Sequence, residues 1–192
     1  MFDRFYIDFI EEHKKRNIES GFKFKNVEHD GHLRRQLKFQ RHHILPKSVN
    51  GKNEATNYVY LSHDDHKYAH VLLAMSYIEQ NHDLNEIKNV SAYAIYEGCY
   101  INRLFNDCPE IKSAIRFVIE TIDNVSVSMT VDEAINMVCI LKNQSPLTPE
   151  NRIKALGTLF NVVYGTMRGK GTFYGRAITI EWKRNYKFIR MN

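Results

Sequence analysis

Residues 40–73 read QRHHILPKSVNGKNEATNYVYLSHDDHKYAHVLL. The stretch places two adjacent histidines ahead of an asparagine and two further histidines, and these five residues are His42, His43, Asn57, His66 and His70. Imidazole rings bind metal ions or accept protons, and a side-chain amide can hydrogen-bond to backbone groups as both donor and acceptor. The stretch therefore predicts a local fold and a chemically active site together.

The first part of this stretch predicts two strands joined by a loop. Residues 39–45 are apolar or tolerant of β structure, and Pro46 ends the strand because it lacks a ladder donor. Residues 47–56 include an Asn-Gly pair, whose members readily adopt the positive φ angles of turns. Residues 58–61 are aromatic or branched, which favours a second strand.

The second part predicts a helix. Ser62 offers a hydroxyl N-cap, and Asp65, three residues later, is placed to complete a capping box. We expect this helix to run to about residue 80. Its core-facing side is expected to contain Tyr68, Leu72, Met75 and Ile78. The predicted order is strand, loop, strand, helix.

Three of the histidines form a candidate metal site. His66 and His70 lie one helical turn apart on one face, so their imidazoles can converge on one cation. His42, at the end of the first strand, is the natural third ligand. Three neutral imidazoles leave coordination positions open, which is typical of a catalytic rather than a structural metal site. His43 is then the candidate general base, since adjacent strand residues point to opposite faces.

The pattern His-His-Ile-x-Pro-x-Ser … Asn-x-x-x-Leu … His-x-x-x-His resembles that of the HNH endonucleases, also called ββα-metal or His-Me finger nucleases. The small phage and intron-encoded homing proteins are especially similar, and colicin-type DNases share the pattern. The resemblance covers residues 40–73, about a fifth of the chain. It implies a ββα-metal core and metal-dependent hydrolysis of DNA phosphodiesters to 5′-phosphate and 3′-hydroxyl ends, by nicking or by double-strand cutting.

The same resemblance assigns roles to individual residues. It implies that His43 is the general base and that Asn57 is the amide that braces the loop and orients the base. The implied metal ligands are His42, His66 and His70. Two departures from the family pattern stand beside these matches. Gln40-Arg41 occupies the place where many relatives carry an acidic residue, and an Asn-Gly pair replaces the frequent Gly-Gly.

Alternative functions and metals stay open at this point. A structural zinc site could use His42, His43, His66 and His70 together, which would describe a zinc-stabilised DNA-binding protein without cleavage. An RNA-directed or toxin-like nuclease is a further alternative. We expect one divalent metal ion. Imidazole ligands favour zinc or nickel, whereas manganese or magnesium is the candidate in the cell.

The formal charge of +5 is distributed unevenly along the chain. Residues 14–41 carry nine basic against three acidic side chains, and residues 151–192 carry nine against one. Residues 79–150 carry eleven acidic against five basic side chains. Because phosphate contacts dominate affinity for nucleic acid, we expect double-stranded DNA to contact the two basic regions. The candidate DNA contacts are Arg41, Lys47, Lys183 and Arg184.

The whole chain is predicted to be α+β. The expected parts are an N-terminal helix and basic connector (1–38), the HNH core (39–80), a mainly helical module (84–171) and a basic, aromatic C-terminal β-hairpin (172–192). Within the module we expect helices near residues 84–105, 109–123 and 131–142, and a further helix from Thr148-Pro149. Thr130 and Glu133 match a capping box for the third of these.

Location and assembly follow from weaker signals. No apolar run approaches the roughly 18 residues that a membrane span needs. The first residues, Met1 to Phe5, lack the uninterrupted apolar stretch of a signal peptide. We therefore expect no membrane partner and a cytoplasmic location, in a bacterial host cell if the protein is phage-encoded. The expected assembly is a monomer or a homodimer.

Overall fold

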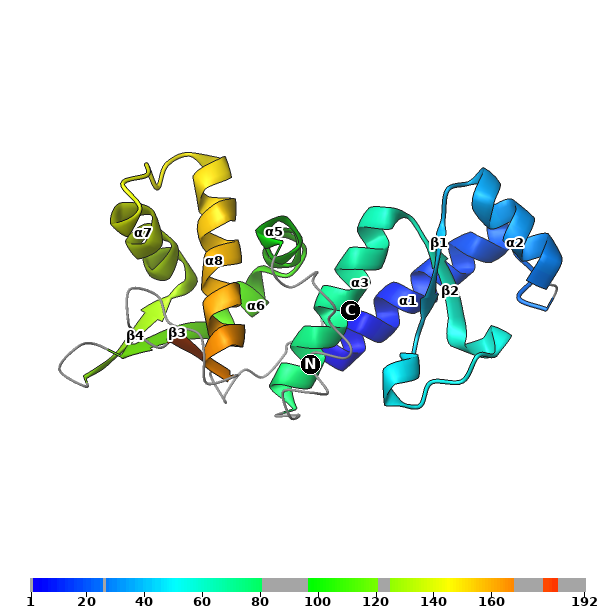
Figure 1. Ribbon diagram of the computed structural model, residues 1–192, viewed down its shortest axis with the longest axis horizontal. Coiled ribbons are helices and arrows are strands. Elements are labelled where there is room, and N and C mark those ends of the chain that lie inside the picture. Colours follow the sequence, from blue (N-terminus) through cyan, green and yellow to red (C-terminus); the bar gives the residue numbers. More distant parts are fainter. Residues whose placement is uncertain (1, 26, 81–96, 121–124, 168–177, 183–192) are drawn as a thin grey trace. The chain divides into compact units, whose positions relative to one another are not determined.

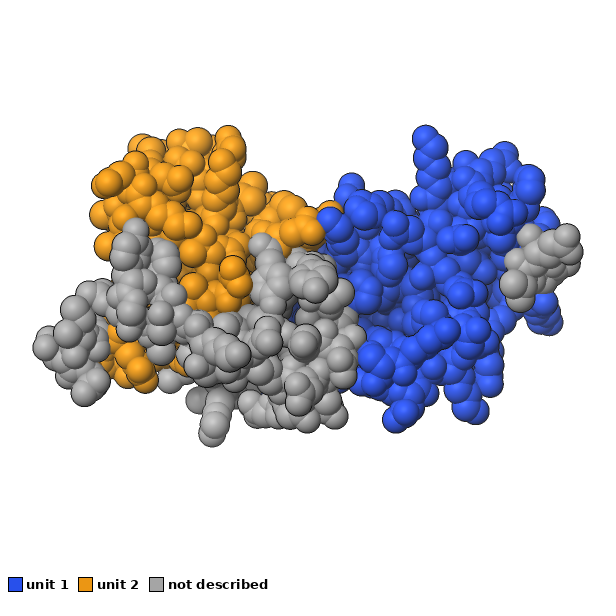
Figure 2. All heavy atoms as spheres, in the orientation of Figure 1, with its two compact units in different colours: residues 1–94 blue, residues 95–192 orange. Residues whose placement is uncertain are grey.

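The computed structural model describes residues 2–25, 27–80, 97–120, 125–167 and 178–182 (Figure 1). The chain divides into two compact units, Met1–Ala94 and Ile95–Asn192, which Figure 2 shows in different colours. Helices and two small antiparallel sheets make up the described residues, so the predicted α+β class is confirmed. No helix in these ranges combines the length and the apolar character that a membrane span needs.

The first unit follows the predicted order of strand, loop, strand and helix. Its elements are α1 (Phe2–Glu19), α2 (Val27–Gln36), β1 (Gln40–His43), two 3₁₀ turns (Lys47–Val49 and Ala55–Asn57), β2 (Tyr58–Leu61) and α3 (His63–Glu79). β1 and β2 pair antiparallel, with His42 opposite Val59 and His43 opposite Tyr58. The Ser62 hydroxyl accepts a hydrogen bond from the Asp65 backbone N–H at 3.1 Å, which caps α3 as predicted.

Helix α3 is buried more completely than its sequence suggests. The predicted core residues Tyr68, Leu72 and Met75 are buried, while the side chain of Ile78 lies outside the described residues. Further buried residues on this helix lie beyond the predicted face, namely Ala69, Val71, Leu73, Ala74 and Ser76. A helix with so little polar surface in its middle turns belongs to the interior of a unit.

Helix α1 packs against α3 and β2 and so belongs to the same unit as the strands. Its buried side chains Tyr6, Ile10, His13 and Asn17 follow a helical spacing of three and four residues. The Asn17 amide donates to the Tyr60 carbonyl at 2.8 Å and accepts from the Tyr60 N–H at 2.7 Å. This amide thus pairs with the free edge of β2 as a neighbouring strand would. The predicted boundary at residue 38 does not separate two compact units.

The prediction that the polar and basic residues 21–40 form an irregular connector or DNA-contacting loop is wrong, because they include helix α2. The Asp30 carboxylate accepts hydrogen bonds from the backbone N–H groups of Lys23 and Phe24, at 2.9 and 2.8 Å. Phe22 stacks on Tyr60 with ring centroids 4.3 Å apart. These contacts tie α2 to the preceding loop and tie that loop to β2. The helix has few apolar residues and an internal glycine, so hydrophobic periodicity carries little signal for it.

The second unit contains a three-stranded antiparallel sheet with the order β4-β3-β5. Its elements are α5 (Gly98–Asp107), α6 (Pro109–Ala114), β3 (Ile115–Glu120), β4 (Ser126–Thr130), α7 (Val131–Leu141), α8 (Pro149–Met167) and β5 (Ile178–Trp182). Thr130 and Glu133 form the predicted capping box of α7. Helix α8 begins at Pro149, as predicted. Residues 84–96 of the first predicted helix lie outside the described residues.

One prediction for this unit needs correction. The helix expected over residues 109–123 ends at Ala114, and β3 follows it, so the module is less helical than expected. Along β3, Ile115, Phe117 and Ile119 are buried and alternate with more exposed residues. In a short, mostly apolar run this period of two is hard to distinguish from a helical pattern by sequence alone. Strand β5 pairs with β3. The turn and return strand of the expected C-terminal hairpin lie outside the described residues.

Candidate metal centre

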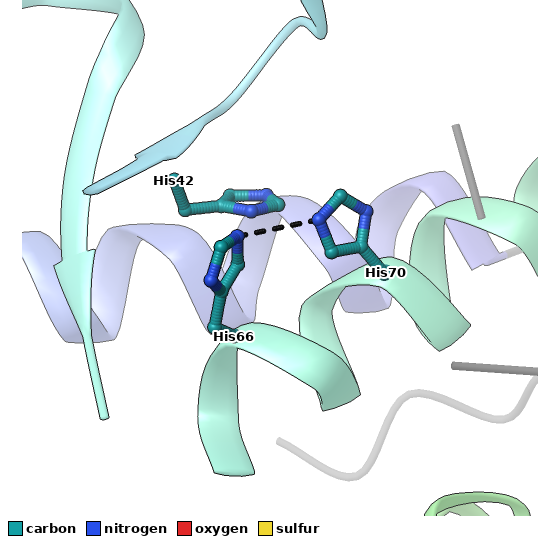
Figure 3. Close-up of side chains that lie close together, drawn as sticks. All are labelled: His42, His66 and His70. Atoms are coloured by element: carbon teal, nitrogen blue, oxygen red, sulfur yellow. Dashed lines mark hydrogen bonds between the residues drawn. The ribbon is translucent and has the colours of Figure 1, made fainter. Parts of the chain in front are cut away.

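The first unit brings the three predicted metal ligands together. His42 comes from β1, and His66 and His70 come from successive turns of α3, so that their rings face one another (Figure 3). One nitrogen of each ring lies within 4.8 Å of the corresponding nitrogen of the other two. The Nε2 atoms of His66 and His70 are 3.3 Å apart. Two nitrogens bound to one tetrahedral zinc ion at about 2.0–2.1 Å lie roughly 3.3 Å apart.

The hydrogen bonds of Tyr6 determine which nitrogen His42 offers. The Tyr6 hydroxyl donates to the Ile44 carbonyl at 2.7 Å, so at 2.9 Å it accepts from His42 Nε2. Burial raises the pKa of the Tyr6 hydroxyl, which keeps its proton for Ile44. This network leaves His42 Nδ1 as the acceptor nitrogen of the ring.

His42 Nδ1 is buried and has no hydrogen-bond partner. A buried polar atom without a partner costs about 1–3 kcal/mol, so such atoms are rare in proteins. A cation held between the three rings would satisfy this lone pair. The donor set of neutral imidazoles and the unpartnered nitrogen therefore both fit a metal ligand site.

The Gln40 amide fixes the tautomer of a second ligand. Its carbonyl oxygen accepts from His66 Nδ1 at 2.5 Å, and its NH₂ group lies 3.0 Å from His63 Nδ1 and donates to it. With the proton of His66 on Nδ1, the Nε2 lone pair faces His70. Such partners of metal-bound histidines orient the rings and raise their basicity. Sequence reasoning noted Gln40 only as a departure from the family pattern.

The electrostatics of the centre favour the neutral form of His42 and His66. Burial, together with the neighbouring rings of His70, His66 and His43, holds the pKa of His42 well below its usual value. Burial, followed by the neighbouring rings of His70, His63 and His43, lowers the pKa of His66 to about 4. Metal ions bind the neutral form of imidazole, so these two ligands need no deprotonation at neutral pH.

His43 does not belong to the ligand group. Among the described residues, the possible ligands are His42, His66 and His70, which disfavours the four-histidine site. His43 Nε2 lies 3.3 Å from Asn53 Oδ1, and its ring stands edge-on to Tyr58. Because Asn53 Oδ1 can only accept, and also accepts from the Tyr58 hydroxyl, the His43 proton is on Nε2. His43 Nδ1 is thus the acceptor nitrogen of that ring.

Asn57 ties together the loop between the two strands. Its Oδ1 accepts from the Leu45 N–H at 2.8 Å, and its Nδ2 donates to the carbonyls of Leu45 and Lys52 at 2.9 and 2.8 Å. Gly51 packs so closely that a Cβ there would lie 1.7 Å from the Leu45 oxygen. Within the described residues, His43 contacts the side chains of Asn53 and Tyr58, so Asn57 can orient that ring only through the loop.

A hollow of about 310 Å³ opens next to the three ligands, and we call it the metal pocket. Its lining includes Arg41, His43 and Lys47. The Arg41 guanidinium lies 4.5 Å from the centre of the Tyr58 ring. Arg41 and Lys47 are two of the predicted DNA contacts, and His43 is the predicted base. The other two predicted contacts, Lys183 and Arg184, lie outside the described residues.

Tyr6, Gln40 and Asn53 are the site residues that sequence reasoning missed. Tyr6 carries the clearest signal, because it is a polar-tipped residue at the helical spacing of the buried face of α1. Its partner His42 is 36 residues away in the sequence. Nothing in the local pattern around Gln40 or Asn53 indicates which histidine each one contacts.

Replacing Tyr6 by Phe is expected to weaken metal binding by about 10–100-fold, since the change removes the hydroxyl that fixes the His42 tautomer. Isothermal titration of the metal-free protein with zinc measures the affinity. Tyr100→Phe, in the second unit, is the matched control and should bind zinc as the wild type does. Wild-type zinc affinity in Tyr6→Phe would contradict a role for this hydroxyl.

Comparisons of the chain with protein-family models, with curated proteins and with solved structures found no match. The geometry of His42, His43, His66 and His70 within the strand, loop, strand and helix of the first unit is therefore what indicates a function.

Proposed function

We propose that this protein is a metal-dependent DNA endonuclease of the HNH type, with residues 40–73 as its ββα-metal core. The observation that carries the proposal is the group of three histidines with a buried, unpartnered His42 Nδ1. Two supporting observations are the loop braced by Asn57 and the position of His43 at the same pocket, outside the ligand group.

The residues around the pocket divide the chemistry between them. A divalent metal ion bound by the three histidines would act as a Lewis acid on the phosphate and stabilise the leaving oxygen. His43 Nδ1 is the acceptor nitrogen that would take a proton from the attacking water. Asn53 and Tyr58 hold the ring of His43 so that this nitrogen keeps its role. The expected products carry 5′-phosphate and 3′-hydroxyl ends.

Three ligands rather than four favour an enzyme over a zinc-stabilised DNA-binding protein. A closed structural zinc site has four protein ligands, whereas a catalytic site keeps a position for water or substrate. The described residues bring three histidines together, while His43 lines the same pocket outside the ligand group and hydrogen-bonds to Asn53. This difference is the physical reason for proposing cleavage.

A plasmid assay tests the proposal. Purified protein is expected to convert supercoiled DNA to nicked circles with zinc, nickel, manganese or magnesium, and to stop in excess EDTA. One metal group per chain predicts nicked circles before linear DNA. Mapping of the ends checks for 5′-phosphates. Duplex binding without cleavage in every metal would replace the proposal with a zinc-stabilised binding protein. Cleavage of RNA alone would identify an RNA-directed nuclease.

A further inference from the structure

A second hollow, of about 500 Å³, is lined by residues of α2, β1, β2 and α3. Gly31, Arg34 and Arg35 come from α2, Arg41 from β1 and Tyr60 from β2, and we call this hollow the arginine cleft. The arginine cleft shares Arg41, His43 and His66 with the metal pocket. A ligand that crosses these shared residues would occupy both hollows.

The three arginines of the cleft differ from four other arginines of the described chain. Arg4, Arg16, Arg103 and Arg152 each pair with a carboxylate. No ion pair joins Arg34, Arg35 or Arg41 to another residue in the described ranges. Arg35 and Arg41 are exposed, and Arg34 is half-buried. Unpaired guanidinium groups beside one hollow provide planar, bidentate donors that suit phosphate oxygens.

Asp30, which directly precedes Gly31 in α2, is already engaged. Asp30 is buried, and its two carboxylate oxygens accept from the backbone N–H groups of Lys23 and Phe24. Burial and the charge of Asp30 raise the pKa of Tyr60, whereas the charges of Arg41 and Arg34 lower it. The carboxylate thus anchors α2 to the preceding loop and leaves the guanidinium groups available to an anion.

Gly31 gives an independent indication that something approaches α2 closely. It lies inside the helix, where glycine is one of the least favourable residues, and it has no positive φ angle that would require it. A Cβ built at Gly31 would meet nothing within 4 Å. Packing within the protein therefore does not explain this glycine. A ligand lying along the cleft would explain it, because the missing side chain leaves room beside the guanidinium groups.

We propose that the arginine cleft binds the DNA backbone next to the cleaved bond, with Arg34, Arg35 and Arg41 on the flanking phosphates and Gly31 beneath the strand. This inference rests on the proposed nuclease function and deepens it. If these arginines bind flanking phosphates, a good substrate must contain more than the one phosphodiester that is cleaved. Such binding also gives α2, which lies outside the HNH-like stretch, a role in holding the DNA.

Measuring duplex binding in EDTA tests the cleft separately from DNA cleavage, because EDTA removes the metal that cleavage would need. The double variant Arg34→Gln/Arg35→Gln is expected to bind a labelled duplex more weakly, with a logarithmic salt slope smaller by about 2. The control Arg4→Gln/Arg103→Gln removes the same charge from arginines that pair with carboxylates, and should keep the wild-type slope. An unchanged slope in the cleft variant, or an equal loss in the control, would overturn the proposal.

A second pair of variants tests the glycine. Gly31→Leu adds a side chain to the cleft at a position where a Cβ meets nothing within 4 Å, so we expect an unchanged or higher thermal midpoint and at least about tenfold weaker duplex binding. His32→Leu places the same leucine side chain at an exposed neighbouring position of α2 outside the cleft lining, and should bind as the wild type does. Wild-type binding by folded Gly31→Leu would contradict a strand that lies against Gly31.

Hydrolysis of a small substrate separates this inference from the proposed function. Bis(p-nitrophenyl) phosphate has one phosphate, so Arg34→Gln/Arg35→Gln should hydrolyse it at the wild-type rate with metal and lose rate only on DNA. Equal losses on both substrates would overturn a role limited to flanking phosphates. If the wild type hydrolyses neither substrate but its salt slope still depends on the two arginines, the nuclease proposal fails while the cleft stands.

Discussion

His43→Ala is expected to lower DNA cleavage by about 10²–10⁴-fold, because the variant loses the group that takes the proton from water. Zinc affinity should stay close to that of the wild type, since His43 is not among the three possible ligands. Duplex binding in EDTA should also persist. Initial rates on plasmid DNA, zinc titration and binding measured on the same preparation check the three statements together.

The control for this prediction is His29→Ala, which removes an exposed histidine of α2 and should leave cleavage unchanged. Asn53→Ala adds a second comparison, because it keeps His43 and removes its hydrogen-bond partner. We expect an intermediate loss of rate in that variant. Cleavage by His43→Ala within about tenfold of the wild-type rate would remove His43 from the role of general base.

His66→Ala and His70→Ala are expected to abolish most of the metal binding and the stability that depends on it. A ligand that binds only the folded state at 1,000 times its dissociation constant stabilises that state by about 4 kcal/mol. The wild-type thermal midpoint should therefore rise when zinc replaces EDTA, and the midpoints of both variants should rise much less. Calorimetry in zinc and in EDTA measures the difference for each protein.

Comparing zinc with EDTA separates loss of the metal from loss of packing, because a cavity left by the removed ring lowers both midpoints. His32→Ala is the matched control, since it removes an exposed histidine of the same unit. Its midpoint should respond to zinc as the wild-type midpoint does. An unchanged zinc affinity in both His66→Ala and His70→Ala would show that neither residue binds the metal.

The elements that the sequence predicted well are those that local interactions specify. Ser62 caps α3 through the N–H of Asp65, and Thr130 and Glu133 cap α7, all within three residues. Pro149 begins α8, where its missing N–H costs nothing. The i and i+4 spacing of His66 and His70 follows from the same short-range geometry. Each of these features can be read in a window of a few residues.

Contacts between distant parts of the chain account for what the sequence did not predict. The helix α2 is held by Asp30 and by the stacking of Phe22 on Tyr60, and its own sequence has little amphipathic pattern. Residues 115–120 become a strand because β4 and β5 pair with them on both sides. In both cases tertiary partners override a weak local preference.

The candidate site shows the same division. The sequence by itself determined the identity and spacing of His42, His43, His66 and His70, because strand alternation and helical periodicity act locally. Only the tertiary structure decided which nitrogen each ring presents. Tyr6 reaches His42 across 36 residues, and Gln40 reaches His66 across 26. Hydrogen bonds between such distant residues depend on how α1, β1 and α3 pack, and no local pattern encodes that packing.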